Sequence, residues 1–359
     1  CAQAQDGAAR QAAMQVQARY PGVIELEVDA SDIERRIQRV RERIPVAPGP
    51  LTLWYPQWIP GNHAPTGPIN QFAGLVVRGN GARIAWTRDD VDMYAFHLDV
   101  PQGVEAIDVE FQYLSPTAKD QGRVAMTPDM LDLQWHRVLL YPAGYDTSRI
   151  RIQPTLLLPR GWQSASALAV ARRDGDTQAF APVSVTTLVD SPVYAGRNYR
   201  RIALETGAKQ PVSIDAFADD PEQLEISPAM LAAHRALVQQ ADRVFGARPF
   251  ARYDFLLALS DTFSGIGLEH RQSSENGTPP GYLLGDAPFG NNTLLSHEYA
   301  HAWNGKFRRP SMLWTPNYNV PMRNELLWLY EGQTEYWSIV LAARAGLLTP
   351  EQTRETLAD

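Results

Sequence analysis

The chain has 359 residues, which is enough for two or three domains of ordinary size. Hydrophobic residues make up 44% of it and charged residues 20%, values typical of a globular protein with an apolar core. Lysine and arginine total 33 against 40 aspartates and glutamates, which gives a net charge of −7. Nucleic acids and anionic membrane surfaces bind clustered basic charge, so we expect neither as the main partner. No stretch of the sequence has the roughly 18 consecutive apolar residues of a transmembrane segment.

The single cysteine, Cys1, stands at the first position of the sequence. One cysteine excludes an intrachain disulfide and a cysteine-cluster metal site. Two interpretations of Cys1 are open: it is the lipid-bearing cysteine of a processed bacterial lipoprotein, or an accident of where the sequence begins. The first predicts a lipid anchor at Cys1 and a periplasmic or membrane-anchored protein. Residues 1–19, which are rich in alanine and glutamine, are expected to form a flexible leader.

Residues 20–218 have the sequence pattern of β structure. Short strand-like runs recur at 24–28, 106–111 and 155–158, and turn-forming segments rich in glycine, proline and asparagine separate them. Between Asp32 and Arg43, clustered arginine and glutamate residues predict a solvent-exposed helix and not a nucleic-acid patch. We therefore expect an N-terminal β-sandwich-like domain over residues 20–218.

The pattern changes after residue 219. Ser227 followed by Pro228 is typical of a helix start, and a helix is expected from Ala229 to Phe245 because Gly246 ends it. A buried strand is expected at 253–259, and further helices at 293–303 and 326–345. The fold class is therefore α+β multidomain, with the second domain over residues 219–359.

The strongest chemical motif is the segment His297-Glu298-Tyr299-Ala300-His301, an H-E-x-x-H pattern. Histidines four residues apart project from one face of a helix, so both imidazoles can reach one metal ion. Glu298 follows at about 100° around the helix, where it can hold a metal-bound water as general base. The alternative is a surface helix that carries these residues without a metal.

Two glutamates downstream lie in a very apolar predicted helix. Glu331 and Glu335 fall within residues 326–337, where an unpaired charge would be costly, so we expect cationic or metal partners for them. For Glu331 the alternative is an ion pair with Arg323 or Arg344.

These segments resemble the gluzincin metallopeptidases, in which H-E-Y-A-H is followed by W-L-Y-E-G. They are similar in more detail to the glycyl aminopeptidase family that carries a C-terminal PDZ domain. The resemblance implies a thermolysin-like (gluzincin) catalytic domain over 219–359 and runs from about residue 20 to the end. The matching positions are residues 58–62, 267–271 and 297–304, Lys306, Arg309, Pro310, Leu327, Trp328, Glu331, Gly332, Thr334 and Tyr336.

The resemblance also implies one zinc ion (Zn2+) per chain. His297, His301 and Glu331 match the family's zinc ligands, and Glu298 matches its catalytic base. A catalytic zinc site has three protein ligands and an open position for water, which this set would provide. Glu325 is a rival third ligand, but it lacks the glycine that follows Glu331.

Three further residues are assigned to the substrate or to the surroundings of the metal. Glu269 matches the position that binds the free α-amine of the substrate in related aminopeptidases, and Gly267 begins the same substrate-binding motif. The alternative for Glu269 is an ion pair with Arg271. Glu335 lies four residues after Glu331 and so on the same helix face, where we expect it to accept a hydrogen bond from a zinc histidine. A solvated or ion-paired Glu335 is its alternative.

The sequence departs from the family in two respects. It ends soon after Glu331, before the tyrosine that stabilises the oxyanion in related gluzincins, and it has neither the remaining helical domain nor the PDZ domain. We therefore expect a catalytic domain truncated at its C-terminus. Tyrosines within the chain could serve instead, with core packing as the alternative for each: Tyr282, Tyr299, Tyr318, Tyr330 and Tyr336.

The expected function is a zinc-dependent aminopeptidase that releases small N-terminal residues, glycine or alanine, from peptides with a free N-terminus. Three alternatives remain open. The first is a zinc endopeptidase with the same site, and the second is a gluzincin with another hydrolytic reaction, such as epoxide opening. The third is a zinc- or peptide-binding fragment without turnover.

Overall fold

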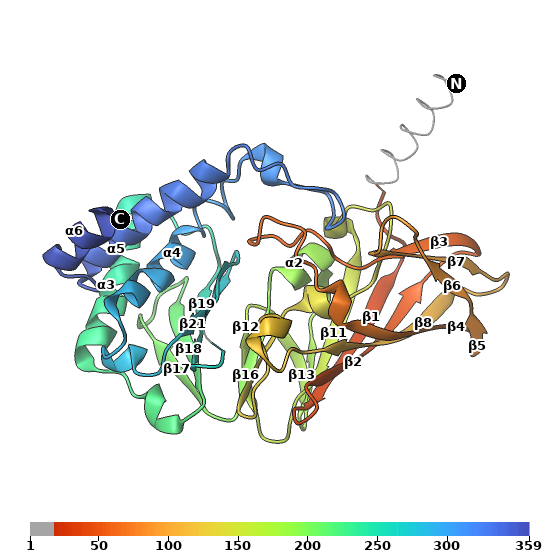
Figure 1. Ribbon diagram of the computed structural model, residues 1–359, viewed down its shortest axis with the longest axis horizontal. Helices are drawn as coiled ribbons and strands as arrows, with labels where there is room; N and C mark the ends of the chain where they lie inside the picture. Colours follow the sequence, from red (N-terminus) through yellow and green to blue (C-terminus); the bar gives the residue numbers. More distant parts are fainter. Residues whose placement is uncertain (1–17, 264, 359) are drawn as a thin grey trace.

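The computed structural model describes residues 18–263 and 265–358 (Figure 1). Both interpretations of Cys1, and most of the expected leader, fall outside these ranges. The molecule is elongated, with β sheets from the first half of the chain at one end and a helix-covered sheet at the other (Figure 1). No helix in the described ranges is long and apolar enough to cross a membrane.

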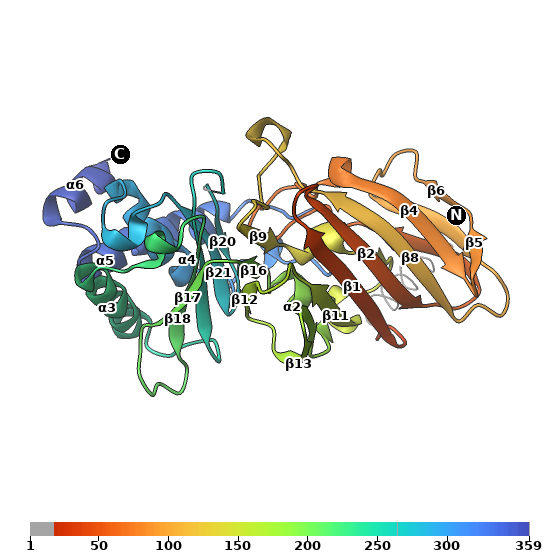
Figure 2. The same cartoon turned by 90° about the horizontal axis from the view of Figure 1, so that it is seen from below.

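The first part of the molecule contains a large twisted sheet, which Figure 2 shows nearly face-on. Its order is β13-β14-β11-β1-β2-β8-β4-β5, with β15 paired to β11. All of its neighbouring strands are antiparallel except β1 and β11, which are parallel. The strands are β1 (Val23–Asp32), β2 (Ile37–Pro45), β4 (Phe72–Gly79), β5 (Ala82–Ile84), β8 (Ala106–Leu114), β11 (Arg151–Leu157), β13 (Val170–Asp174), β14 (Thr177–Phe180) and β15 (Val183–Ser184).

Two smaller sheets complete this part, and much of both packs with the large sheet around one apolar core. The sheet β10-β3-β7-β6 comprises β3 (Gly49–Trp54), β6 (Trp86–Arg88), β7 (Ala95–Val100) and β10 (Tyr141–Pro142). The sheet β12-β16-β9 comprises β9 (Met130–Leu133), β12 (Gln163–Ser166) and β16 (Val193–Gly196). The expected β-sandwich-like architecture is confirmed. Short helices connect the strands: η1 (Ile69–Gln71), η2 (Lys119–Gln121), η3 (Trp135–Val138), η4 (Thr147–Arg149) and α2 (Val185–Val189).

The helix expected between Asp32 and Arg43 is wrong. Strand β1 continues to Asp32, and β2 begins at Ile37. Alternate side chains of β2 are buried, which is the period of a strand. The arginines occupy the solvent face, so the density of charge concealed the alternation. The buried residues are Gln38, Val40, Glu42 and Ile44.

The second part is a five-stranded sheet in the order β17-β18-β19-β21-β20. Its three inner strands are parallel, and the edge strands β17 and β20 are antiparallel to their neighbours. Because β20 is an edge strand, it pairs on one side only within the described chain. The strands are β17 (Tyr199–Ala203), β18 (Val212–Ala218), β19 (Tyr253–Leu259), β20 (Gly267–Glu269) and β21 (Ser273–Thr278).

Helices cover the face of this sheet that is turned away from the first part (Figure 2). The opposite face packs against the three-stranded sheet of the first part through residues such as Tyr194 and Phe217. The helices are α3 (Pro228–Phe245), α4 (Leu294–Ala300), α5 (Gln333–Ala345) and α6 (Pro350–Ala358), with the shorter η5 (Pro221–Leu224), η6 (Tyr282–Leu284), η7 (Phe289–Thr293) and η8 (Ser311–Leu313).

The second sheet begins before residue 219, at which the sequence pattern changes. Strands β17 and β18 belong to it because β18 pairs in parallel with β19. Locally they resemble the strands that precede them, and only this long-range pairing assigns them to the second sheet. Residue 219 therefore marks the beginning of the helix-rich segment, whereas the sheet itself starts at Tyr199.

Candidate metal centre and active site

The two histidines of the H-E-x-x-H segment lie on α4 and at its C-terminal end. Leu295, Tyr299 and Ala300 are buried in the core of the second part and fix the orientation of this helix. His297 and His301 therefore share the opposite face, and their Nε2 atoms lie 3.0 Å apart.

Glu331 lies in a π-helical turn, η9 (Trp328–Gly332), that leads directly into α5. Such turns are rare and occur frequently at functional sites. Its Oε2 atom lies 3.4 Å from His297 Nε2 and 3.3 Å from His301 Nε2. The structure therefore brings the three expected zinc ligands together, with ligand atoms within 4.8 Å of one another.

The other residues considered as ligands or partners lie apart from this group. Glu325 is half exposed and pairs with Arg323 at 2.7 Å. Arg344 donates a hydrogen bond to Gln240. Within the described residues, the ion pair of Glu331 with either arginine is therefore not formed.

The outer nitrogens of both imidazoles contact protein oxygens. His297 Nδ1 lies 2.8 Å from Glu335 Oε2, and His301 Nδ1 lies 3.0 Å from the carbonyl oxygen of Asn304. With a proton on each Nδ1 atom, both Nε2 atoms would be available to bind a metal ion together with Glu331. The expected contact between Glu335 and a histidine is thus present. The Asn304 side chain also donates to the Leu329 and Tyr330 carbonyls, which holds the π turn against α4.

This donor set fits a zinc ion. Burial lowers the pKa of His297, but hydrogen bonds to Glu331 and Glu335 outweigh burial and raise it to about 10. The negative potential that stabilises a protonated histidine here also attracts a divalent cation. Two imidazoles and one carboxylate are also the ligands of known catalytic zinc sites.

Glu298 is buried beside the metal centre, with 4% of its surface exposed. Burial raises the pKa of its carboxyl to about 7. The backbone of Gly267 lies directly against it, since a Cβ atom there would be 2.3 Å from Glu298 Oε1. The expected substrate-binding glycine therefore also provides space for the expected base.

Glu269 ends the edge strand β20 and is buried. The Tyr330 hydroxyl donates to its Oε1 atom, and Lys306 Nζ lies 3.8 Å from the same atom. Its cationic partner among the described residues is thus Lys306 and not Arg271. Burial opposes ionisation, but Lys306, with His301 and His63, lowers the pKa of Glu269 to about 2. Glu269, Glu298 and His301 offer polar atoms within 4.8 Å of one another.

His63 belongs to the site although it was not among the predicted site residues. It comes from the loop after β3 in the first part, and its Nε2 atom lies 2.7 Å from Glu331 Oε1. Its backbone is left-handed, with φ of 50°, and the Asn324 side chain donates to its carbonyl oxygen. Its position directly after the 58–62 motif was the available clue.

Of the tyrosines considered for the oxyanion, Tyr330 alone contacts a predicted site residue, Glu269. Tyr282, Tyr299 and Tyr318 have the core positions of the alternative interpretation, whereas Tyr336 is exposed and does not pack in a core. Tyr282 and Tyr299 are buried in the helical core, Tyr318 lies in the core of the first part, and Tyr336 is 54% exposed.

Two family sequence models match the chain. Residues 25–197 match the peptidase M61 N-terminal domain, and residues 291–359 match the M61 glycyl aminopeptidase model. Together these matches span about two thirds of the chain and fall in both parts of the molecule. The chain belongs to the M61 peptidase family. No curated protein sequence matches it.

Solved structures of an aminopeptidase N family protein, a zinc metallopeptidase and a hydrolase share the fold of this M61 chain. An aminopeptidase N family protein from Idiomarina loihiensis superposes with a TM-score of 0.79 at 19% identity, covering 94% of this chain and 57% of that one. A variant of the M1 zinc metallopeptidase from Deinococcus radiodurans, bound to a Tyr-Ser-Ala substrate, gives 0.51 at 14% identity over 94% of this chain and 72% of that one. Yeast LTA4 hydrolase in complex with bestatin gives 0.51 at 14% identity, over 89% and 47%. The chain thus spans just over half of the Idiomarina protein and has the expected gluzincin fold.

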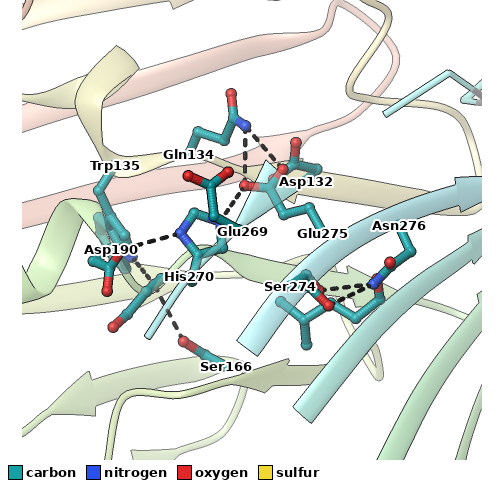
Figure 3. Close-up of polar contacts among 12 residues, drawn as sticks. Asp132, Gln134, Trp135, Ser166, Asp190, Glu269, His270, Ser274, Glu275 and Asn276 are labelled. Carbon is teal, nitrogen blue, oxygen red and sulfur yellow. Dashed lines mark hydrogen bonds and ion pairs between the residues drawn. The ribbon is translucent and has the colours of Figure 1, made fainter. Parts of the chain in front are cut away.

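A buried network of charged side chains extends from Glu269 between the two parts of this M61 protein. Lys306 Nζ lies 3.0 Å from Asp190 Oδ1, and His270 joins Asp190 to Glu275 (Figure 3). Gln134 donates to both oxygens of Glu275 (Figure 3). Because each carboxylate has a donor, Lys306 is held in place and the position of Glu269 is fixed with it.

Proposed function

We propose that the protein is a zinc-dependent aminopeptidase that releases small N-terminal residues, glycine or alanine, with one zinc ion per chain. The observation that carries the proposal is the convergence of His297, His301 and Glu331 beside two further buried carboxylates. Membership of the M61 family, and structural relatives named as zinc metallopeptidases, support it.

In the proposed reaction, each residue of the site has a separate role. A zinc ion bound by His297, His301 and Glu331 would polarise the scissile carbonyl and lower the pKa of the attacking water. Glu298 accepts a proton from that water and delivers it to the leaving amine. Its pKa of about 7 allows the carboxyl to take up and release a proton near neutral pH. Glu335 keeps His297 in the orientation that directs Nε2 inward.

Glu269 would make the enzyme an aminopeptidase. Its buried carboxylate forms a charge-assisted pair with the α-ammonium group of a peptide. Its polar atoms lie within 4.8 Å of those of Glu298 and His301, so the separation is at most slightly more than the roughly 3.8 Å between consecutive Cα atoms. A peptide anchored at Glu269 by its amine therefore presents its first peptide bond to Glu298 and the metal ligands. An N-terminal blocking group would remove the charge and prevent this pairing.

The test compares glycyl and alanyl peptides with their N-acetylated forms on zinc-loaded protein. We expect cleavage of the free peptides only, and a loss of about 10²- to 10⁴-fold in kcat for Glu298→Gln with zinc retained. Glu269→Gln should raise KM for free peptides, whereas the exposed control Glu325→Gln should change neither constant. Cleavage of acetylated peptides would identify an endopeptidase. Zinc binding without cleavage of any peptide would identify a non-catalytic binding protein.

A further inference from the structure

A polar cavity of about 530 Å³ lies next to the active site, on the side of the first part. The segment 265–267 lines both this cavity and the one that contains His297 and Glu298. Gly267 also packs directly against Glu298. This backbone segment therefore lies between the cavity and the catalytic base.

The lining of this cavity is basic in a protein of net charge −7. Arg123 and Arg137 contribute to it, together with uncharged side chains such as Gln134, and no described lining residue carries a carboxylate. His136 also lines it, but burial lowers the pKa of His136 and keeps the ring neutral. We call it the basic cavity. Acidic side chains instead gather around the metal ligands, so the two neighbouring cavities differ in charge.

The two arginines differ in their partners. Arg123 pairs with Asp132, and its Nη2 atom lies 3.5 Å from Glu275 Oε2. Arg137 forms no ion pair with the described part of the chain, and its Nη1 atom is buried without a hydrogen-bond partner. Only 7% of Arg137 is exposed, and the Tyr113 ring lies 5.8 Å from its guanidinium carbon. A buried guanidinium that no carboxylate contacts directly is unfavourable, and an anionic ligand would reduce that penalty.

The edge strand β20 provides a path from the amine site to the basic cavity. Its outer edge pairs with no other described strand, so an extended peptide can add to it by backbone hydrogen bonds. A peptide whose amine is bound at Glu269 and whose chain runs antiparallel to β20 passes Gly267 and then Gly265. Both glycines line the basic cavity as well as the cavity of the metal ligands, so residues beyond the cleaved bond pass along the boundary of the basic cavity.

We propose that Arg137 binds a carboxylate of the peptide substrate, so that the peptide is held by its ammonium group at Glu269 and by a carboxylate in the basic cavity. This inference rests on the proposed function. Guanidinium groups bind carboxylates through two parallel hydrogen bonds, a geometry that an ammonium or amide does not offer. The carboxylate belongs either to an acidic side chain or to the C-terminus of a short peptide.

The experiment uses two pairs of peptides that differ by one carboxylate. Ala-Glu-Ala-amide against Ala-Gln-Ala-amide tests a side chain, and Ala-Ala against Ala-Ala-amide tests the C-terminus. Affinities are measured by calorimetry on zinc-loaded Glu298→Gln protein, and kcat/KM on the protein with Glu298 intact. We expect the carboxylate member of one pair to be favoured about 10-fold or more, mainly in Kd and KM. The pair that shows the preference identifies the source of the carboxylate.

Arg137→Met should reduce this ratio to about one, and Arg137→Lys should restore part of it. Arg160→Met, at an exposed turn after β11, is the matched control and should keep the full ratio. The proposal would be overturned by equal affinity within both peptide pairs, or by a preference that persists in Arg137→Met. Equal affinity within both pairs can be measured without the Arg137 variant, so this outcome does not depend on whether that variant folds. Failure of the proposed function is a different result, because calorimetry would still report the carboxylate preference if no peptide were hydrolysed.

Discussion

Gly61 lies where a loop of the first part meets Glu269, and alanine at this position should damage peptide binding without removing zinc. A Cβ atom there would lie 2.4 Å from Leu268 Cδ1 and 2.8 Å from Glu269 Oε2. Leu268 and Glu269 are both buried, so neither side chain can swing into solvent. The backbone at Gly61, with φ of 85°, adds about 1 kcal/mol of strain for an L-residue.

We expect the contact to displace Glu269, and a misplacement of about 1 Å costs on the order of 10²-fold in rate. The kcat/KM for alanyl peptides with a free N-terminus should therefore fall about 100-fold, which corresponds to roughly 2.7 kcal/mol. Zinc content should stay the same, because the three atoms nearest to the added Cβ belong to Leu268 and Glu269 and none belongs to a metal ligand.

Gly103→Ala provides the matched control. Its φ of 80° imposes similar backbone strain, but no atom lies within 4 Å of the added Cβ. The free energy of unfolding of Gly103→Ala should fall by about 1 kcal/mol, which is the same cost of backbone strain. Its kcat/KM should stay within about 2-fold of that of the unmodified protein, because this strain lies away from the site. A Gly61→Ala protein with nearly unchanged kcat/KM would refute the conclusion that this glycine makes room for Glu269.

Three further predictions concern stability and metal affinity. Burial raises the pKa of the Glu42 carboxyl well above its ordinary value of 4.5, so the native state keeps a proton that the unfolded chain loses. Between about pH 4.5 and the native pKa of Glu42, the free energy of unfolding of the unmodified protein should fall relative to that of Glu42→Gln. The expected slope is about 1.4 kcal/mol per pH unit. If denaturant titrations gave the same pH dependence of the free energy of unfolding for both proteins, the prediction would be contradicted. His63→Ala should weaken zinc binding by about 10- to 100-fold in competition with a chromogenic chelator, because Glu331 loses a hydrogen-bond partner; an unchanged Kd would show that the contact does not orient Glu331. Arg201→Met should lower the free energy of unfolding by about 2 kcal/mol, because buried Asp215 loses its cation while the half-exposed arginine limits the effect; a loss under about 0.5 kcal/mol would exclude this role.

The metal ligands could be predicted because their relation is mostly local. Two histidines four residues apart on a helix must share a face. The resemblance to the gluzincins implied Glu331 as the third ligand, and its apolar sequence surroundings indicated a charged or metal partner. The π turn that carries Glu331 could not be foreseen, since its backbone is fixed by packing and by the Asn304 side chain. The sequence therefore predicted which residues meet, but not how the helix adjusts to bring them together.

Other parts of the site depend on contacts that no local pattern records. His63 is 268 residues from Glu331 in sequence, and only the packing of the two parts joins them. The cationic partner of Glu269 is Lys306, whereas sequence proximity had suggested Arg271. The arginine-rich strand β2 was predicted as a helix because charge density was weighed above the alternation of its buried residues.

The loop that carries His63 has a consequence for the order of folding. Contacts between residues far apart in sequence form only after much chain entropy has been lost, so the contact of His63 with Glu331 should form late. The two histidines of α4 are four residues apart and can approach each other early. During refolding, weak metal capture by α4 should therefore precede tight binding, which arises only when the two parts have docked. In small zinc domains the metal drives the chain to fold, whereas here its final affinity would report that folding is complete.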